Sequence, residues 1–232
     1  MKVLMTILCA ILLTTKAFAA GTISGMVKFD GEAPKFKEIK MDADPICMSF
    51  HKDPVYPQSL VLGEGNAMGN VLVYVKNAPK SDSPAPSEPL VIDQKGCNYV
   101  PHVMGVQVGQ KVKILNPDGT LHNVHVMSKV NAEFNLAMPK FRTEVEKSFD
   151  KAEMPPFALK CDVHPWMTGW MAVFPHSFYA VTGPDGKFEI KNLPAGKYEV
   201  DAWHEKLGTK TVTVDVTDNA TADFTFAAPN KS

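Results

Sequence analysis

The sequence predicts an all-β protein, and three observations support this fold class. Short runs rich in β-branched and aromatic residues recur along the chain. Turn signals built from the 15 glycines and 18 prolines separate these runs. We find no apolar periodicity typical of a helix longer than two turns. Short strands joined by tight turns favour sandwiches or barrels.

The first 19 residues have the pattern of a cleavable signal peptide. Lys2 precedes an apolar run at residues 3–13, and small residues at 17–19 form the expected cleavage site. Cys9 lies inside the apolar run, which does not favour a lipid-modified cysteine. We therefore expect a periplasmic or secreted protein, with residues 1–19 removed and no transmembrane segment in the mature chain.

Charge and length narrow the possible functions. The 232 residues include 24 lysines and arginines against 25 aspartates and glutamates, a net charge of −1. Such a balance does not favour nucleic acid as a partner. The length exceeds one typical domain and allows two modest hydrophobic cores.

The first part of the chain contains two predicted strands, at residues 21–29 and 70–76. An irregular stretch with methionines and prolines lies between them. Residues 77–89 then contain four prolines and three serines, a composition typical of linkers. We expect a domain boundary there.

A second set of strands is predicted after Leu90. They lie at residues 103–108, 111–115, 122–127, 143–149 and 157–161. Turn signals such as Asn116-Pro117-Asp118-Gly119 separate them. Short antiparallel strands at this spacing indicate a sandwich or a Greek-key barrel.

The carboxy-terminal part also consists of short predicted strands separated by turn signals. Turn signals at residues 183–186 and 192–196 separate three further strands. A strand with the alternating residues Val212, Val214 and Val216 follows, and a last strand runs through Phe224 and Phe226.

Residues 180–200 (AVTGPDGKFEIKNLPAGKYEV) resemble the carboxypeptidase regulatory-like family of transthyretin-type β-sandwiches. Members of that family open with a Gly-x-hydrophobic strand, followed by a second strand that resembles residues 70–76. Here both pieces precede residue 87. The resemblance therefore implies a smaller β-sandwich in two parts, residues 20–86 with an irregular insert and residues 177–232.

Four potential metal ligands stand out between these two parts. His122 precedes a Cys-x-x-His-x-x-Met segment that contains Cys161, His164 and Met167. Two imidazoles, one thiolate and one weak axial thioether form the set that a blue-copper site uses. A histidine on one strand and a Cys-x-x-His pair at the end of another can converge, and Pro165 restricts the ligand loop.

Other metal centres fit these residues less well. Zinc is disfavoured because a thioether is a poor zinc ligand, and no obvious general base accompanies the site. Covalent haem is excluded because the chain lacks Cys-x-x-Cys-His.

Leu121-His122-Asn123-Val124-His125 and residues 161–167 resemble the cupredoxin family of type 1 copper domains, in particular its amicyanin-like members. The resemblance implies a Greek-key cupredoxin sandwich at residues 87–176, inserted in the split sandwich. It makes Asn123 the residue that fixes the ligand loop by hydrogen bonds. It assigns the copper ligands as equatorial His122, Cys161 and His164 and axial Met167.

The resemblance also implies a docking surface. In cupredoxins, the histidine that corresponds to His164 reaches the surface inside an apolar patch. Pro165 and Trp166 follow His164 directly. We therefore expect redox partners to dock over these two residues.

The remaining cysteines and histidines allow two interpretations. If Cys161 binds metal, Cys47 and Cys97 are free to form a disulfide, which we predict; the alternative is that they bind a second metal. We expect His51, His102, His125, His176 and His204 to make hydrogen bonds in loops, and the alternative is again a second metal site. His125 should face away from His122, because an offset of three residues along a strand reverses the side chain.

The function predicted from these features is that of an exported type 1 copper protein. It would carry single electrons between Cu(I) and Cu(II), with a cytochrome or dehydrogenase as redox partner, and would not be an enzyme. One alternative is a periplasmic protein for copper trafficking or sensing. Another is a cell-envelope interaction module.

Overall fold

The computed structural model describes residues 20–79 and 84–228, so the predicted signal peptide at residues 1–19 lies outside the described residues. The all-β prediction is confirmed. The elements are β1 (Gly21–Asp30), α1 (Pro45–Ser49), β2 (Val61–Leu62), the 3-10 turn η1 (Glu64–Asn66), β3 (Met68–Gly69), β4 (Leu72–Val75), β5 (Leu90–Gln94), β6 (Tyr99–Val100), β7 (Val103–Gln107), β8 (Lys111–Leu115), β9 (His122–Val126), β10 (Phe134–Met138), β11 (Glu144–Ser148), β12 (Glu153–Lys160), β13 (Thr168–Phe174), β14 (Tyr179–Val181), β15 (Lys187–Leu193), β16 (Gly196–His204), β17 (Gly208–Val216), β18 (Asn219–Thr221) and β19 (Phe224–Ala227).

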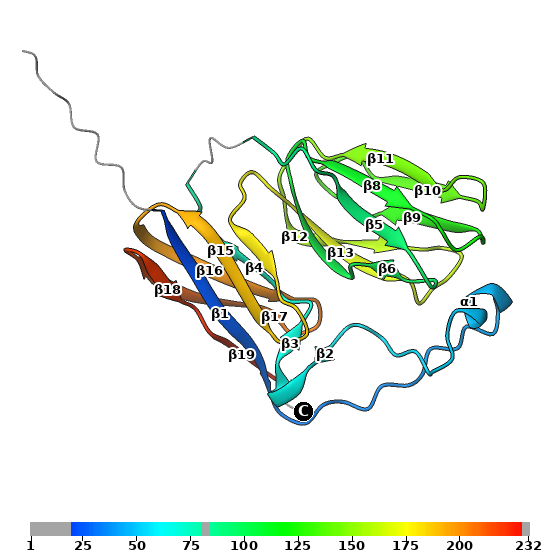
Figure 1. Ribbon diagram of the computed structural model, residues 1–232, viewed down its shortest axis with the longest axis horizontal. Helices are drawn as coiled ribbons and strands as arrows, with labels where there is room; N and C mark the ends of the chain where they lie inside the picture. Colours follow the sequence, from blue (N-terminus) through cyan, green and yellow to red (C-terminus); the bar gives the residue numbers. More distant parts are fainter. Residues whose placement is uncertain (1–19, 80–83, 229–232) are drawn as a thin grey trace, which may run out of the picture.

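Most strands belong to two pairs of sheets that lie beside each other (Figure 1). One pair, here the outer pair, consists of the sheet β15-β1-β18, with β19 also on β1, and the sheet β14-β4-β16-β17. The other pair, here the middle pair, consists of β10-β9-β12-β13-β7 and β11-β8-β5-β6. Strands β2 and β3 form a small separate ladder.

The chain enters and leaves the middle pair of sheets at one place. All strands of the middle pair, β5 to β13, lie in sequence between β4 and β14. Strands β4 and β14 are themselves antiparallel neighbours, with Val73 opposite Ala180. The outer pair is therefore built from the two ends of the chain, as the pairing of Ile23 in β1 with Ile190 in β15 also illustrates.

Alternating side chains explain why these strands bury one face. In β17, Val214 and Val216 are buried whereas Thr213 and Asp215 are exposed, which is the period of two expected for a strand with one face on a core. Each pair of sheets encloses its own apolar cluster. A third cluster joins the two pairs, and its buried members are Leu72, Val103, Ala172, Phe174 and Trp203.

Two details differ from the sequence expectation. The middle pair is not purely antiparallel, because β7 runs parallel to β13 and β5 runs parallel to β8. These neighbours are far apart in the sequence, and the chain crosses between sheets before it returns, so no local turn signal reports their direction. Strand β10 was also missed, although Phe134-Asn135-Leu136 alternates apolar and polar residues.

Residues 31–60, here called the strap, follow β1 and cross to one end of the middle pair of sheets, where α1 lies (Figure 1). Asp44 caps α1 by accepting hydrogen bonds from the amides of Ile46 (2.8 Å) and Cys47 (3.4 Å). His51 contacts the carbonyl oxygen of Gly96 through Nε2 at 2.8 Å, as a donor.

A disulfide between Cys47 and Cys97 fastens the strap to the turn between β5 and β6. The predicted pairing is confirmed. The alternative, in which these two sulfur atoms bind a second metal, is wrong because both are consumed in the bond.

Candidate metal centre

Three of the four predicted ligands, His122, Cys161 and His164, meet at the end of the middle pair of sheets that the strap covers. His122 is the first residue of β9, and Cys161 and His164 lie in the loop between β12 and β13. One donor atom from each of them lies within 4.8 Å of the others, and all three residues are buried. The loop is closed by its own backbone, since the Cys161 amide donates to the Met167 carbonyl (3.1 Å) and the Met167 amide donates to the His164 carbonyl (2.9 Å).

The donor atoms are spaced for one metal ion. Nδ1 of His122 lies 2.9 Å from Nδ1 of His164, and Sγ of Cys161 lies 3.8 Å from Nδ1 of His164. Bonds of about 2.0 Å to nitrogen and about 2.3 Å to sulfur place donors of one ion at separations of this size. The two imidazoles and the thiol therefore fit a single shared ion.

A carboxylate contacts the Nε2 atom of each imidazole, on the side of the ring opposite the facing Nδ1 atoms. Nε2 of His122 lies 3.0 Å from Oδ2 of Asp118, and Nε2 of His164 lies 3.0 Å from Oδ2 of Asp44. A carboxylate accepts, so each Nε2 carries a proton, and each Nδ1 is the nitrogen that would offer its lone pair to a metal ion once it is deprotonated. Carboxylates in this position orient metal-binding histidines and raise their basicity.

Asp118 and Asp44 belong to the candidate site, but neither was among the residues predicted for it from the sequence. Asp118 was assigned only to a turn, although its place four residues before His122 was a usable signal. Its carboxylate also accepts from the amides of Gly96 (2.9 Å) and Cys97 (2.7 Å), which fixes it. Asp44 gave no signal, because 120 residues separate it from His164.

Charges within the centre favour an ionised cysteine. Burial lowers the pKa of His122, but the hydrogen bond to Asp118 and the nearby Cys161 outweigh burial and raise that pKa to about 9. Burial raises the pKa of the Cys161 thiol, but the neighbouring His122 is among the causes that hold it below its usual value. Burial lowers the pKa of His164, and Asp44 opposes this only in part. The facing Nδ1 atoms of His122 and His164 lie within hydrogen-bond distance of each other, at 2.9 Å.

Asn123 lies where the cupredoxin resemblance puts a residue that fixes the ligand loop. Its Oδ1 accepts hydrogen bonds from the amides of Asp162 (2.7 Å) and Val163 (3.3 Å) and from Sγ of Cys161 (3.3 Å). Met167 is fully buried in the same apolar cluster as Cys161. The hydrogen bonds of Asn123 connect β9 to the loop that follows β12.

The expectation that His164 reaches the surface is wrong. Its residue exposure is 2%, because the strap covers it with Asp44 and with Cys47, whose Sγ lies 3.6 Å from Nε2. Pro165 is exposed as predicted, whereas Trp166 is half-buried and donates from Nε1 to the Cys97 carbonyl (3.1 Å). The Trp166 and His164 rings lie 5.1 Å apart between centroids.

The described residues contain no metal cluster separate from this centre. The other His, Cys and Asp groups, Asp44–Cys47–His164 and Cys97–Asp118–His122, include the disulfide sulfurs and share the same histidines. His125 contacts Asp162 (3.3 Å) and Glu133 (3.1 Å) on the opposite face of β9, as its offset from His122 predicted.

His102, which the sequence analysis could not place, joins the two pairs of sheets. Its Nδ1 donates to the carbonyl of Thr168 (3.0 Å), and its Nε2 lies 2.6 Å from Oε1 of Glu205, in the turn between β16 and β17. Both side chains are buried. Burial raises the pKa of Glu205, but the hydrogen bond to His102 together with the charges of His102 and Lys206 outweighs burial and lowers that pKa. Thr168 directly follows Met167, so this contact connects the outer pair of sheets to the end of the ligand loop.

No family model matches the chain, and no curated protein matches it. Among solved structures, the chain is similar to a mutant of amicyanin in its Cu(I) form, with 23% identity, 44% of this chain and 98% of that chain covered, and a TM-score of 0.33. A mutant of amicyanin in its oxidised state gives 24% identity, the same coverages and a TM-score of 0.34.

A copper-containing nitrite reductase from Thermus scotoductus SA-01 is similar at 22% identity, with 42% of this chain and 24% of that chain covered and a TM-score of 0.32. The regulatory-like resemblance of the outer pair of sheets has no counterpart among these structures. The function is therefore inferred from the residues themselves.

Proposed function

We propose that this chain is an exported type 1 copper protein that carries single electrons between redox partners. The observation that carries the proposal is the buried convergence of His122, Cys161 and His164 on one point. Copper bound there would supply one-electron exchange between Cu(I) and Cu(II). Met167, buried beside Cys161, is the proposed axial ligand.

The chain's own residues prepare the site before metal arrives. Asp118 and Asp44 hold the two imidazoles with their Nδ1 atoms facing inward. Asn123 holds the cysteine loop through three hydrogen bonds. Because these groups are fixed by buried contacts, little rearrangement accompanies a change of charge at the centre, and this favours electron transfer over substrate chemistry.

We propose that the redox partner, such as a cytochrome or a dehydrogenase, docks over the covered face of His164. Pro165 and Val163 are exposed there, beside Trp166. Helix α1 lies over the same histidine and exposes Ile46 and Met48, and Phe50, directly after the helix, is exposed as well. An exposed apolar patch of this kind fits the small interface of a transient redox encounter.

We propose a division of the chain that follows the sheet connections. Residues 87–176 would form the copper domain, inserted in a regulatory-like sandwich made of residues 20–86 and 177–232. The pairing of β4 with β14 on either side of the insertion supports this division. Export would follow from residues 1–19. No helix among the described residues has the length and apolar character needed to cross a membrane.

A visible absorption spectrum of the mature protein with added Cu(II) tests the proposed centre. An intense thiolate-to-copper band is expected, lost in Cys161→Ser and in His122→Gln. His125→Gln is the matched control, because His125 lies on the same strand but faces away and should leave the band unchanged. Tight copper binding without this band, or a band that survives in Cys161→Ser, would contradict the proposal.

Copper trafficking is the second candidate, and the burial of His164 favours it. A histidine closed off by the strap retains metal and slows direct contact with a partner. Transfer of Cu(I) to a chelator, measured with the disulfide intact and reduced, separates the two functions. Fast electron exchange with slow copper loss supports the carrier, whereas copper release on reduction of the Cys47–Cys97 bond supports trafficking.

A further inference from the structure

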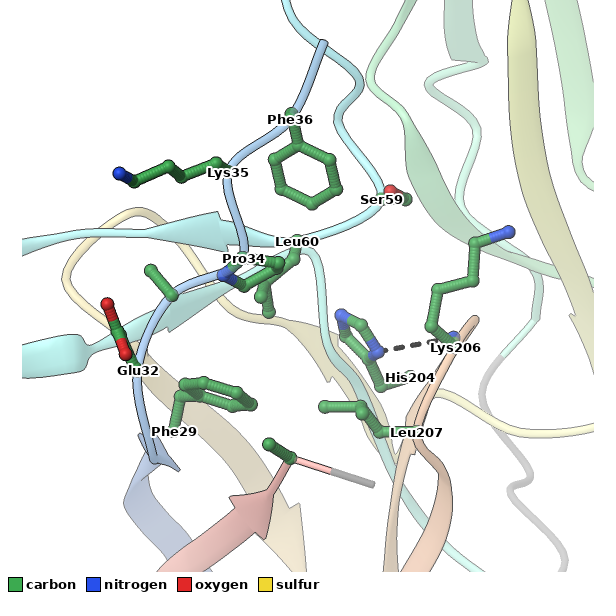
Figure 2. A pocket seen from close by; sticks show the side chains of 12 residues that line it. Phe29, Glu32, Pro34, Lys35, Phe36, Ser59, Leu60, His204, Lys206 and Leu207 are labelled. Atoms are coloured by element: carbon green, nitrogen blue, oxygen red, sulfur yellow. Dashed lines mark hydrogen bonds between the residues drawn. The ribbon is translucent and has the colours of Figure 1, made fainter. Parts of the chain in front are cut away.

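A pocket of about 860 Å³ lies between the two ends of the strap and the outer pair of sheets (Figure 2), away from the strap residues Asp44 and Cys47 that cover His164. The strap forms one wall, and the turn between β16 and β17 forms the facing wall. Residues 32–36 and 59–60 of the strap line it, together with the end of β1 and residues 204–207.

The walls of this pocket are mainly apolar. Phe29 and Phe36 supply aromatic surface, and Leu60 and Leu207 supply aliphatic surface. A concave, largely apolar pocket of this size with few polar groups is typical of small-molecule sites. The polar groups that do face it therefore decide which ligand it accepts.

His204 is the buried polar side chain of the pocket, with an exposure of 2%. Its Nδ1 accepts a hydrogen bond from the amide of Lys206 at 3.3 Å. Burial lowers the pKa of His204 to about 4, so the ring is neutral at pH 7. With Nδ1 as acceptor, the single ring proton must be on Nε2.

Nε2 of His204 is on the far edge of the ring from Lys206 and points into the pocket (Figure 2). Within the part of the chain that the structure describes, this N–H has no hydrogen-bond partner. It therefore faces the open pocket, where a ligand that accepts from it would replace water with a hydrogen bond between mainly apolar walls.

The charged groups remain at the rim of the pocket. Lys35, Glu32 and Lys206 are exposed, and the ammonium of Lys206 lies 3.7 Å from a carboxylate oxygen of Glu205. No charged side chain among the described residues is buried in the pocket wall to pair with a charged ligand. A charge placed between these apolar walls would be poorly compensated, so the pocket favours a neutral molecule.

We propose that this pocket binds a small neutral molecule with an aromatic body and one carbonyl oxygen, which accepts a hydrogen bond from Nε2–H of His204. The aromatic body would pack between the phenylalanine rings and the leucine side chains. The site is independent of the proposed copper function, because none of its lining residues is a proposed metal ligand.

Titration of the mature protein with the fluorescent ketone 6-propionyl-2-dimethylaminonaphthalene tests the proposal. Saturable binding with a blue-shifted emission is expected. His204→Phe keeps the ring volume but removes the donor, and it should weaken binding about tenfold, which is the effect of one neutral hydrogen bond to a buried group. The analogue 2-dimethylaminonaphthalene, which lacks the carbonyl, should bind more weakly and equally to both proteins.

His176→Phe is the matched control. His176 is also buried, accepts an amide hydrogen bond at Nδ1 from two residues further on (Phe178, 3.2 Å), and has its pKa lowered to about 4 by burial, but it does not line the pocket. This variant should bind the ketone like the wild type. Ala33→Trp, at the exposed rim, should block binding without touching the buried histidine.

Two results would overturn the proposal. One is the absence of saturable binding to the wild type. The other is unchanged affinity of His204→Phe for the ketone; should that variant not fold, unchanged affinity of Ala33→Trp has the same meaning.

Discussion

His122 in the candidate metal centre and His204 in the apolar pocket are equally buried but differ in what they contact. Their exposures are 0% and 2%. His122 faces the carboxylate of Asp118 and the sulfur of Cys161, and its pKa is raised to about 9. His204 faces a backbone amide and apolar side chains, and its pKa is lowered to about 4. Contacts, not burial, therefore decide whether a buried histidine is charged.

The two regions also differ in how they are held. The metal centre is fixed by two carboxylates and by the disulfide that fastens the strap. The pocket is held by apolar packing, such as that of His204 against Phe226, with 6.0 Å between ring centroids. The first arrangement suits an ion and the second suits a neutral molecule, and the following predictions test this contrast.

Removal of the disulfide should have the largest effect. Cys47 and Cys97 are 50 residues apart, and a bridge closing a loop of this length stabilises by about 4 kcal/mol in the chain-entropy model. The Cys47→Ser, Cys97→Ser double variant should lose that free energy of unfolding in urea. Reduction of the wild type should give the same loss, and equal stability of the two oxidation states would show that the strap is held by other contacts.

Asp118→Ala should come next, at about 3 kcal/mol in the metal-free protein. It removes the carboxylate from a buried, protonated His122 and leaves the amides of Gly96 and Cys97 without their acceptor. Asp162→Ala is the control, because Asp162 pairs with His125 and two asparagine side chains at an exposed site, where such contacts contribute little to stability, so its loss should be much smaller. Similar losses of unfolding free energy for both variants, measured in urea, would show that the buried Asp118 contributes no more than the exposed Asp162.

The stability contributed by His122 should fall as the pH rises, whereas the stability contributed by His204 and His176 should fall as the pH drops. The raised pKa of His122 stabilises the metal-free protein fully below pH 6.5, and this contribution is lost as the pH rises through 9. The lowered pKa values of His204 and His176 contribute stability above pH 6.5, and this is lost as the pH falls through 4. Each histidine should account for about 2 kcal/mol, between pH 7 and 9 or between pH 7 and 5.

Urea unfolding across pH 5 to 9 measures both losses. Asp118→Asn should flatten the alkaline side, and His204→Phe should reduce the loss on the acid side. If Asp118→Asn leaves the alkaline side unchanged, the raised pKa of His122 does not come from its carboxylate partner.

His204→Phe should have the smallest effect on stability at pH 7, about 1 kcal/mol or less. It removes one hydrogen bond to a neutral ring and places another apolar ring among apolar neighbours. Thermal unfolding at neutral pH measures this, and a loss of several kcal/mol would mean that the histidine supports the fold by contacts beyond the one with Lys206.

Features that depend on residues within one short segment were predictable from the sequence. The order Cys161, His164 and Met167 on one loop indicated the donors, and the even number of cysteines left over indicated the disulfide. Alternation predicted strands such as β17. Asp118 was within reach of the same approach, because it lies in a turn four residues before His122.

Features that depend on the arrangement of distant segments were not predictable. Asp44 and His164 are separated by 120 residues, and His102 and Glu205 by 103. The parallel pairing of β7 with β13 likewise joins segments with no common local pattern. The sequence thus gave no reason to expect that the strap would cover His164.

Because the strap covers His164, it matters whether a metal ion or the Cys47–Cys97 disulfide comes first. A metal ion that reached the chain before Cys47 and Cys97 were joined would meet a histidine with an open edge. An ion that arrives later meets a closed surface and waits for α1 to move. The state of one disulfide, whose sulfur atoms are outside the proposed ligand set, would therefore decide how readily an ion reaches the centre.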